Sequence, residues 1–122
     1  MADTRRSTGT QHLSFTRTTT SDGITVLRLR GEIDHHTVAP LHQALTVQDT
    51  TSAPRTVVDL KEVTFMDSTG LNALIAGHRA TLDTPGWIRL ADAQPPVLRV
   101  IQITGLDTFI DYHPTLGQAL TA

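Results

Sequence analysis

The sequence has 122 residues, 39% of them hydrophobic, with ten Lys or Arg against twelve Asp or Glu and a formal net charge of −2. These values are typical of a globular protein with a single core, and we expect one domain. The spread of charge argues against direct nucleic-acid binding, and no apolar run approaches the ~18 residues of a membrane span. The absence of cysteine excludes disulfides and thiolate metal sites. With no recognisable signal peptide, we expect a cytoplasmic protein without membrane contact.

The first third of the chain predicts a disordered lead followed by a β-hairpin. Residues 1–11 are rich in Thr, Ser and Arg and offer almost nothing to bury. Alternating apolar residues then predict an edge strand over 12–19 and a second strand over 24–29, joined by a turn at 21–23. Gly31 breaks the pattern, which indicates a bend in the backbone after the second strand.

Helices and strands alternate through the rest of the chain. A first helix is predicted from residue 38 to about residue 48, then a polar loop over 49–54 and a β-branched strand over 55–60. The next helix carries an apolar face made of five residues at helical spacing, and a Thr-Pro-Gly sequence ends it. Those five residues are Leu71, Leu74, Ile75, His78 and Leu82.

The C-terminal part repeats the alternation. A fourth strand is predicted over 87–90, a third helix over 95–104 with Gly105 as its stop, a short strand over 109–112 and a last helix over 115–120. An initial hairpin followed by alternating elements predicts an α/β fold, a mixed and mostly parallel sheet of about four to five strands with about four helices packed on it. Burial preferences place Trp87 and the three phenylalanines in the core.

The turn between the third strand and the second helix contains Asp67, Ser68, Thr69 and Gly70. Helix capping is the commonest role of such residues, and each cap contributes ~1 kcal/mol. A nucleophilic serine is a second reading, although no G-x-S-x-G sequence surrounds Ser68. Phosphorylation is a third, because the N-terminus of a helix favours an added anion. The turn alone leaves these three readings open.

Two other groups of residues resemble known kinds of site. His35 and His36, with His42 further on, lack a carboxylate at a metal-binding spacing, so we expect no metal. Gly70 and Gly77 do not form a glycine-rich phosphate loop, which argues against an NTPase.

Three segments resemble signatures of STAS domains, and in particular of the bacterial anti-sigma factor antagonists of sporulation and stress pathways. They are GEIDHHT at 31–37, VVDL at 57–60 with MDSTGL at 66–71, and ITGLD at 103–107 with Phe109 and Ile110. The resemblance implies a single STAS-type domain over residues 12–122. By position, it implies that Ser68 is the phosphorylated serine.

The resemblance also implies a mechanism. The unphosphorylated protein would bind an anti-sigma factor that is itself an ATP- and Mg²⁺-dependent serine kinase, and this binding would release a sigma factor. Phosphorylation of Ser68 would end the binding, and a metal-dependent serine phosphatase would reset it. The protein would be a substrate and a binder without catalytic activity or cofactor of its own. A STAS scaffold or sensor module in a stress-signalling complex is the alternative, and a small serine hydrolase comes third.

The surface around Ser68 is expected to contact the partner. Asp34 and Asp67 follow neighbouring strands, so their carboxylates should meet at one end of the sheet. Asp34→Ala should leave melting nearly unchanged but reduce both the binding of the kinase and the labelling of Ser68. The expected contact residues are Glu32, Asp34, His35, His36, Asp67, Thr69, Gly70, Leu71 and Asn72.

Overall fold

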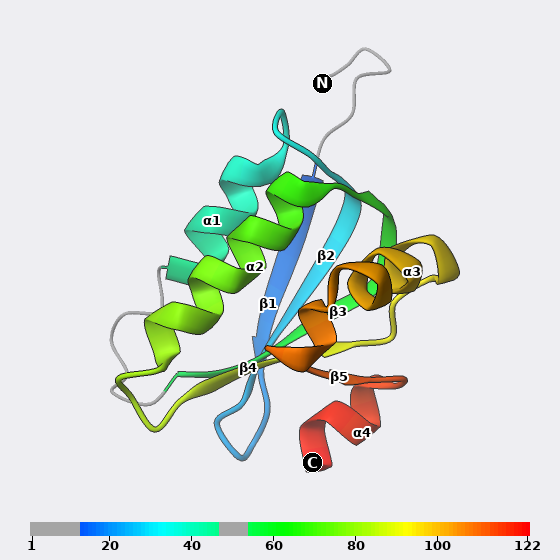
Figure 1. The fold of residues 1–122 in the computed structure, drawn as a ribbon. Helices are drawn as coiled ribbons and strands as arrows, with labels where there is room; N and C mark the ends of the chain where they lie inside the picture. Colours follow the sequence, from blue (N-terminus) through cyan, green and yellow to red (C-terminus); the bar gives the residue numbers. More distant parts are fainter. Residues whose placement is uncertain (1–12, 47–53) are drawn as a thin grey trace, which may run out of the picture.

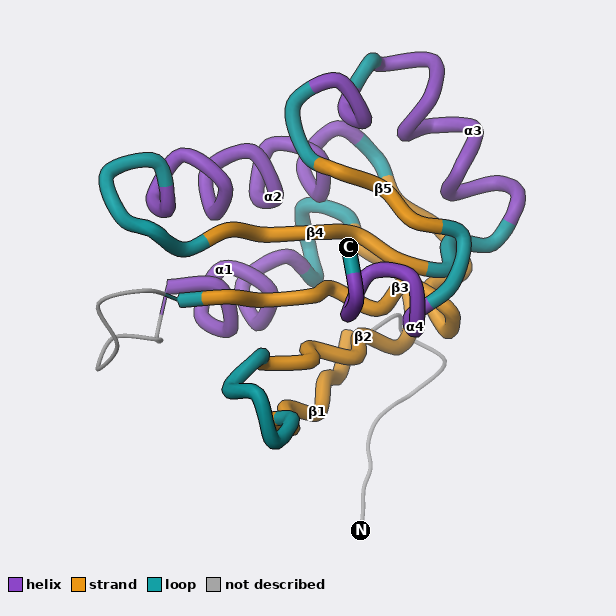
Figure 2. Tube along the Cα trace, turned by 90° about the horizontal axis from the view of Figure 1, so that it is seen from below, coloured by secondary structure: helices purple, strands orange, loops and turns teal. Residues whose placement is uncertain are grey.

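The computed structural model describes residues 13–46 and 54–122, and these form a five-stranded sheet with strands in the order β1-β2-β3-β4-β5. Strand β1 is antiparallel to β2, and the other neighbouring strands pair in parallel, which confirms the predicted mixed sheet. Figure 2 shows the strands following one another from β1 to β5. The strands are β1 (Leu13–Thr19), β2 (Thr25–Ile33), β3 (Arg55–Met66), β4 (Trp87–Ala91) and β5 (Asp111–His113).

Helices cover both faces of this sheet. They are α1 (Val38–Thr46), α2 (Ser68–Thr81), α3 (Pro95–Thr104), the short 3-10 helix η1 (Leu106–Thr108) and α4 (Leu116–Thr121). In Figure 1, α1 and α2 run side by side along the sheet. The neighbours Val57 and Val58 on β3 belong to two separate apolar clusters, because successive strand residues point to opposite faces. The main core therefore lies under α1, α2 and α3, and a smaller one lies under α4.

The described residues contain no helix of the length and apolar character that crossing a membrane requires. The predicted disordered lead 1–11, the end of the predicted first helix near Gln48 and the predicted loop residues 49–53 fall outside the described residues.

Strands β2 and β3 are longer than the sequence pattern predicts, because two irregularities interrupt their alternation. Arg28 pairs with Asp59 but Arg30 pairs with Glu62, so β3 carries one extra residue, and a second shift follows Gly31. Gly31 has a φ of 117°, a conformation that glycine adopts without steric cost. Such bulges bend a strand, and here β3 continues past Leu60 as far as Met66.

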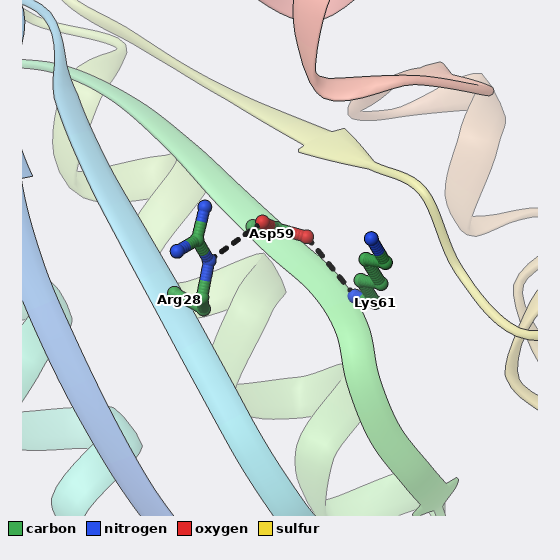
Figure 3. A network of polar contacts seen from close by, with 3 residues as sticks. All are labelled: Arg28, Asp59 and Lys61. Atoms are coloured by element: carbon green, nitrogen blue, oxygen red, sulfur yellow. Dashed lines mark hydrogen bonds and ion pairs between the residues drawn. The ribbon is translucent and has the colours of Figure 1, made fainter.

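Asp59 stabilises the first of these bulges. Its side chain is 3% exposed. Its Oδ2 accepts a hydrogen bond from Arg28 Nε at 3.0 Å, and the two side chains form an ion pair. Oδ1 accepts the backbone N–H of Lys61, also at 3.0 Å. Figure 3 shows both contacts as dashed lines. The carboxylate thus accepts a backbone N–H at the bulge in the middle of β3.

Three predicted core residues are exposed instead. Phe109 is 63% exposed and Phe65 is 47% exposed, whereas Phe15 and Trp87 pack against the two cores as predicted. Leu82, directly after the last residue of α2, is 64% exposed. Phe109 follows η1, and strand β5 begins only at Asp111, two residues later than predicted.

Candidate functional site

The ends of β2 and β3 bring two turns together. Ile33 pairs with Met66 as the last register pair of these parallel strands, and the backbone N–H of Asp67 donates to the carbonyl of Ile33 at 3.1 Å. The turn over 34–37 therefore lies beside the turn that starts α2. This juxtaposition was predicted from the order of the strands, and the structure confirms it.

Asp67, and not Ser68, caps the second helix. The backbone of Asp67 is extended, and its Oδ1 accepts the N–H of Thr69 at 2.9 Å. Its carbonyl accepts the N–H of Leu71, the first hydrogen bond of the helix. Ser68 is the first helical residue and is exposed, and no hydrogen bond to its hydroxyl occurs within residues 13–46 and 54–122. The capping role is thus filled, and the Ser68 hydroxyl is available for chemistry.

The neighbouring turn is held by Asp34 and Thr37. Asp34 Oδ1 accepts the backbone N–H groups of His36 and Thr37 at 2.9 and 3.1 Å. The Thr37 hydroxyl is buried, donates to the carbonyl of Glu32 at 2.6 Å and accepts the N–H of Asp34 at 2.9 Å. Asp34 therefore has a structural role that the sequence did not reveal.

We expect Asp34→Ala to lower the free energy of unfolding by about 1 kcal/mol, since the N–H of His36 loses its acceptor and the N–H of Thr37 keeps only the Asp34 carbonyl. Asp34→Asn is the matched control, because its side-chain oxygen can accept the same N–H groups while the charge is lost. Urea denaturation should therefore rank Asn close to wild type and Ala below both. If the alanine variant were as stable as wild type, the turn would not depend on this side chain.

A shallow hollow of about 640 Å³ lies between these turns, and we call it the acidic hollow. It is lined by Glu32, Asp34, His35, Thr64, Phe65 and Asp67. Three of its six residues carry carboxylates, so it is suited to receive a basic group of a partner protein. Phe65 lines this hollow, although its sequence context suggested a core residue.

The expected contact residues divide by burial. Gly70 is buried because α2 packs tightly on the strand ends: a Cβ there would lie 2.6 Å from Ile33 Cγ2 and 2.7 Å from Met66 Cγ. Leu71 is only 7% exposed. The accessible members are the exposed His35, His36 and Asn72 with the half-buried Glu32, Asp34, Asp67 and Thr69.

The two histidines of this turn lie against each other, with ring centroids 3.9 Å apart. Over the part of the chain that the structure describes, no three His, Cys, Asp or Glu side chains gather in an arrangement suited to a metal ion. The functional groups at this site are the Ser68 hydroxyl, the carboxylates of the acidic hollow and the exposed rings of His35, His36 and Phe65.

The motifs around this site are matched by a known family. A model of the STAS domain covers residues 16–119 of this chain. The chain is a member of the STAS domain family. This STAS domain is 29% identical over 100 residues to an anti-sigma F factor antagonist of Paenibacillus polymyxa, covering 81% of this chain and 86% of that protein.

Solved structures agree with the sequence match. A crystal structure of an anti-sigma factor antagonist from Mycobacterium paratuberculosis aligns with a TM-score of 0.78 and 34% identity, covering 89% of this STAS domain and 92% of that chain. The antagonist SpoIIAA, in its unphosphorylated form, aligns with a TM-score of 0.66 and 26% identity, covering 88% and 93%. The predicted resemblance to STAS-domain anti-sigma factor antagonists is confirmed. The names of these relatives describe regulatory proteins and not enzymes.

Proposed function

We propose that this STAS domain is an anti-sigma factor antagonist controlled by phosphorylation of Ser68. Unphosphorylated, it binds an anti-sigma factor that is also a serine kinase, and the sigma factor is released. Transfer of a phosphoryl group from ATP, with Mg²⁺, to Ser68 ends this binding. A metal-dependent phosphatase hydrolyses the phosphoserine and restores the binding form. In this cycle, which we place in the cytoplasm, the chain is a substrate and performs no catalysis.

The observation that carries this proposal is the exposed Ser68 hydroxyl at the first position of α2. Asp67 already caps the helix, so the hydroxyl has no structural task that phosphorylation would disturb. The relatives are named as antagonists of anti-sigma factors, and one of them is distinguished by its unphosphorylated form. Both facts favour a phosphorylation switch over a capping or nucleophilic role.

A phosphoryl group at this position is compatible with the fold. The first N–H groups of a helix have no intrahelical acceptor, and the helix dipole favours negative charge at this end. A phosphoserine adds about −1.5 to −2 units of charge near these groups. The switch therefore acts on the partner contact and leaves the domain folded.

The test is phosphorylation by purified anti-sigma factor kinases from the organism that encodes this chain, with radiolabelled ATP and Mg²⁺. Wild type should be labelled, and Ser68→Ala should lose the label completely because its acceptor hydroxyl is gone. Thr69→Ala is the matched control: it removes the adjacent hydroxyl and should be labelled like wild type. Undiminished label on Ser68→Ala, mapped to Thr69 or elsewhere, would contradict the assignment of Ser68.

A further inference from the structure

A second hollow opens on the other side of Ser68, and we call it the apolar hollow. It has a volume of about 180 Å³ and is bordered by α2, by the end of α3 and by η1. Its lining residues are Ser68, Leu71, Asn72, Ile75, Thr104, Leu106 and Phe109. The proposed phosphorylation site and an exposed aromatic ring thus border the same small hollow, although they lie far apart in the sequence.

Phe109 is held at this hollow by a well-anchored turn. Gly105, with a φ of 75°, ends α3 and leads the chain into η1. Leu106 and Ile110 are buried on either side of the turn, and the Leu106 carbonyl accepts the N–H groups of Phe109 and Ile110 at 2.9 and 3.0 Å. The backbone between two buried anchors therefore keeps the Phe109 side chain 63% exposed. An aromatic residue fixed in contact with water in this way is typical of an interface.

The two hollows differ in charge. None of the seven residues that line the apolar hollow is charged, whereas the acidic hollow has three carboxylates. Asp67 lines the acidic hollow and the next residue, Ser68, lines the apolar hollow, so the two hollows meet at this turn. A protein that covers Ser68 must therefore present a basic group on one side and an apolar group on the other, since charge and polarity are matched across interfaces.

We infer that the apolar hollow is a docking site for an apolar side chain of the anti-sigma factor, with Phe109 as its main contact. This inference rests on the proposed function, and it adds a contact that lies outside the surface expected from the sequence. It also explains how one phosphoryl group ends the binding. The phosphoserine would stand at the edge of an uncharged hollow, where an inserted apolar group would strip water from it without offering a counter-charge.

The experiment uses the anti-sigma factor that labels Ser68 in the phosphorylation test, and calorimetry gives its Kd for the unphosphorylated chain. Phe109→Ala removes the ring and should weaken binding at least tenfold. Thr104→Phe fills the hollow from its edge, where Thr104 is exposed, and should weaken binding to a similar extent. Leu82→Ala is the matched control: Leu82 is 64% exposed and borders a separate hollow that Phe109 also lines, but it does not line the apolar hollow, so this variant should bind like wild type.

Circular dichroism melting accompanies each variant, so that a loss of fold is separated from a loss of contact. Weakening by both hollow variants, with Leu82→Ala unchanged, supports the docking site. Wild-type affinity in either hollow variant, or equal weakening by Leu82→Ala, overturns it while the Ser68 switch stands. Failure of unphosphorylated wild type to bind any anti-sigma factor kinase of the organism overturns both the proposed function and this inference.

Discussion

Gly86→Ala is expected to destabilise the domain by about 3 kcal/mol, because its new methyl group would collide with backbone that cannot move independently. A Cβ at this position would lie 2.7 Å from Pro54 N and closer still to Pro54 O. That carbonyl accepts the N–H of Trp87 at 2.8 Å, next to the first register pair of β3 and β4, Arg55 with Trp87. Relief of the collision would therefore pull β3 and β4 apart where their pairing begins.

Gly117→Ala is the control for this prediction. Gly117 lies in α4, and the nearest atom to its hypothetical Cβ is Thr115 Oγ1 at 4.0 Å. Alanine there should raise the free energy of unfolding by about 0.5 kcal/mol, because the unfolded chain loses freedom and the helix gains propensity. Urea denaturation of both variants measures the difference. A Gly86→Ala protein within about 0.5 kcal/mol of wild type would show that the Pro54 backbone yields easily.

Phosphorylation of Ser68 is expected to weaken the affinity for the anti-sigma factor by more than tenfold, which corresponds to more than about 1.4 kcal/mol. The added charge stands between a hollow that already carries three carboxylates and a hollow without charged residues. Neither set of lining residues supplies a Lys or Arg to neutralise it. A partner that closes over Ser68 must therefore remove water from the phosphate. The loss of this water also strengthens the repulsion between the phosphate and the three carboxylates of the acidic hollow.

Ser68→Asp should reproduce this loss in part, with a weakening of at least tenfold, because aspartate carries less charge than phosphoserine. Ser68→Ala should keep the wild-type affinity and serves as the control for loss of the hydroxyl alone. Calorimetry measures the affinities, and thermal melting should show that the phosphoprotein stays folded. Equal binding by the phosphoprotein and the unphosphorylated protein would remove the switch.

The position of Ser68 could be predicted from the sequence because local signals mark it. A β-branched run, three capping residue types and an apolar face at helical spacing follow one another between residues 55 and 82, and α2 does begin at Ser68. Gly105 was likewise recognised as a helix stop. Each of these features depends on the chemistry of a few consecutive residues, which the sequence contains directly.

The proximity of the two turns was also predictable, because it needs only the order of the strands. Neighbouring parallel strands place the residues that follow them at the same edge of the sheet. The pairing of Ile33 with Met66 therefore brings Asp34 and Asp67 to one site. The hydrogen bonds that Asp34 makes within its own turn were not evident from its residue type, because the same carboxylate suits a turn or a partner contact.

Only the tertiary structure decided which residues are accessible around Ser68. The sequence placed Phe65 and Phe109 in the core and Gly70 among the partner contacts, whereas the structure exposes the two phenylalanines and buries the glycine. The extra residues in β3 change which side chains face outward, and the turn after Gly105 directs Phe109 to the apolar hollow. The sequence by itself determined the order of the helices and strands and the position of Ser68 at the start of α2. Burial depends on contacts between distant segments, so the shape of the surface around that serine was settled only when the segments packed together.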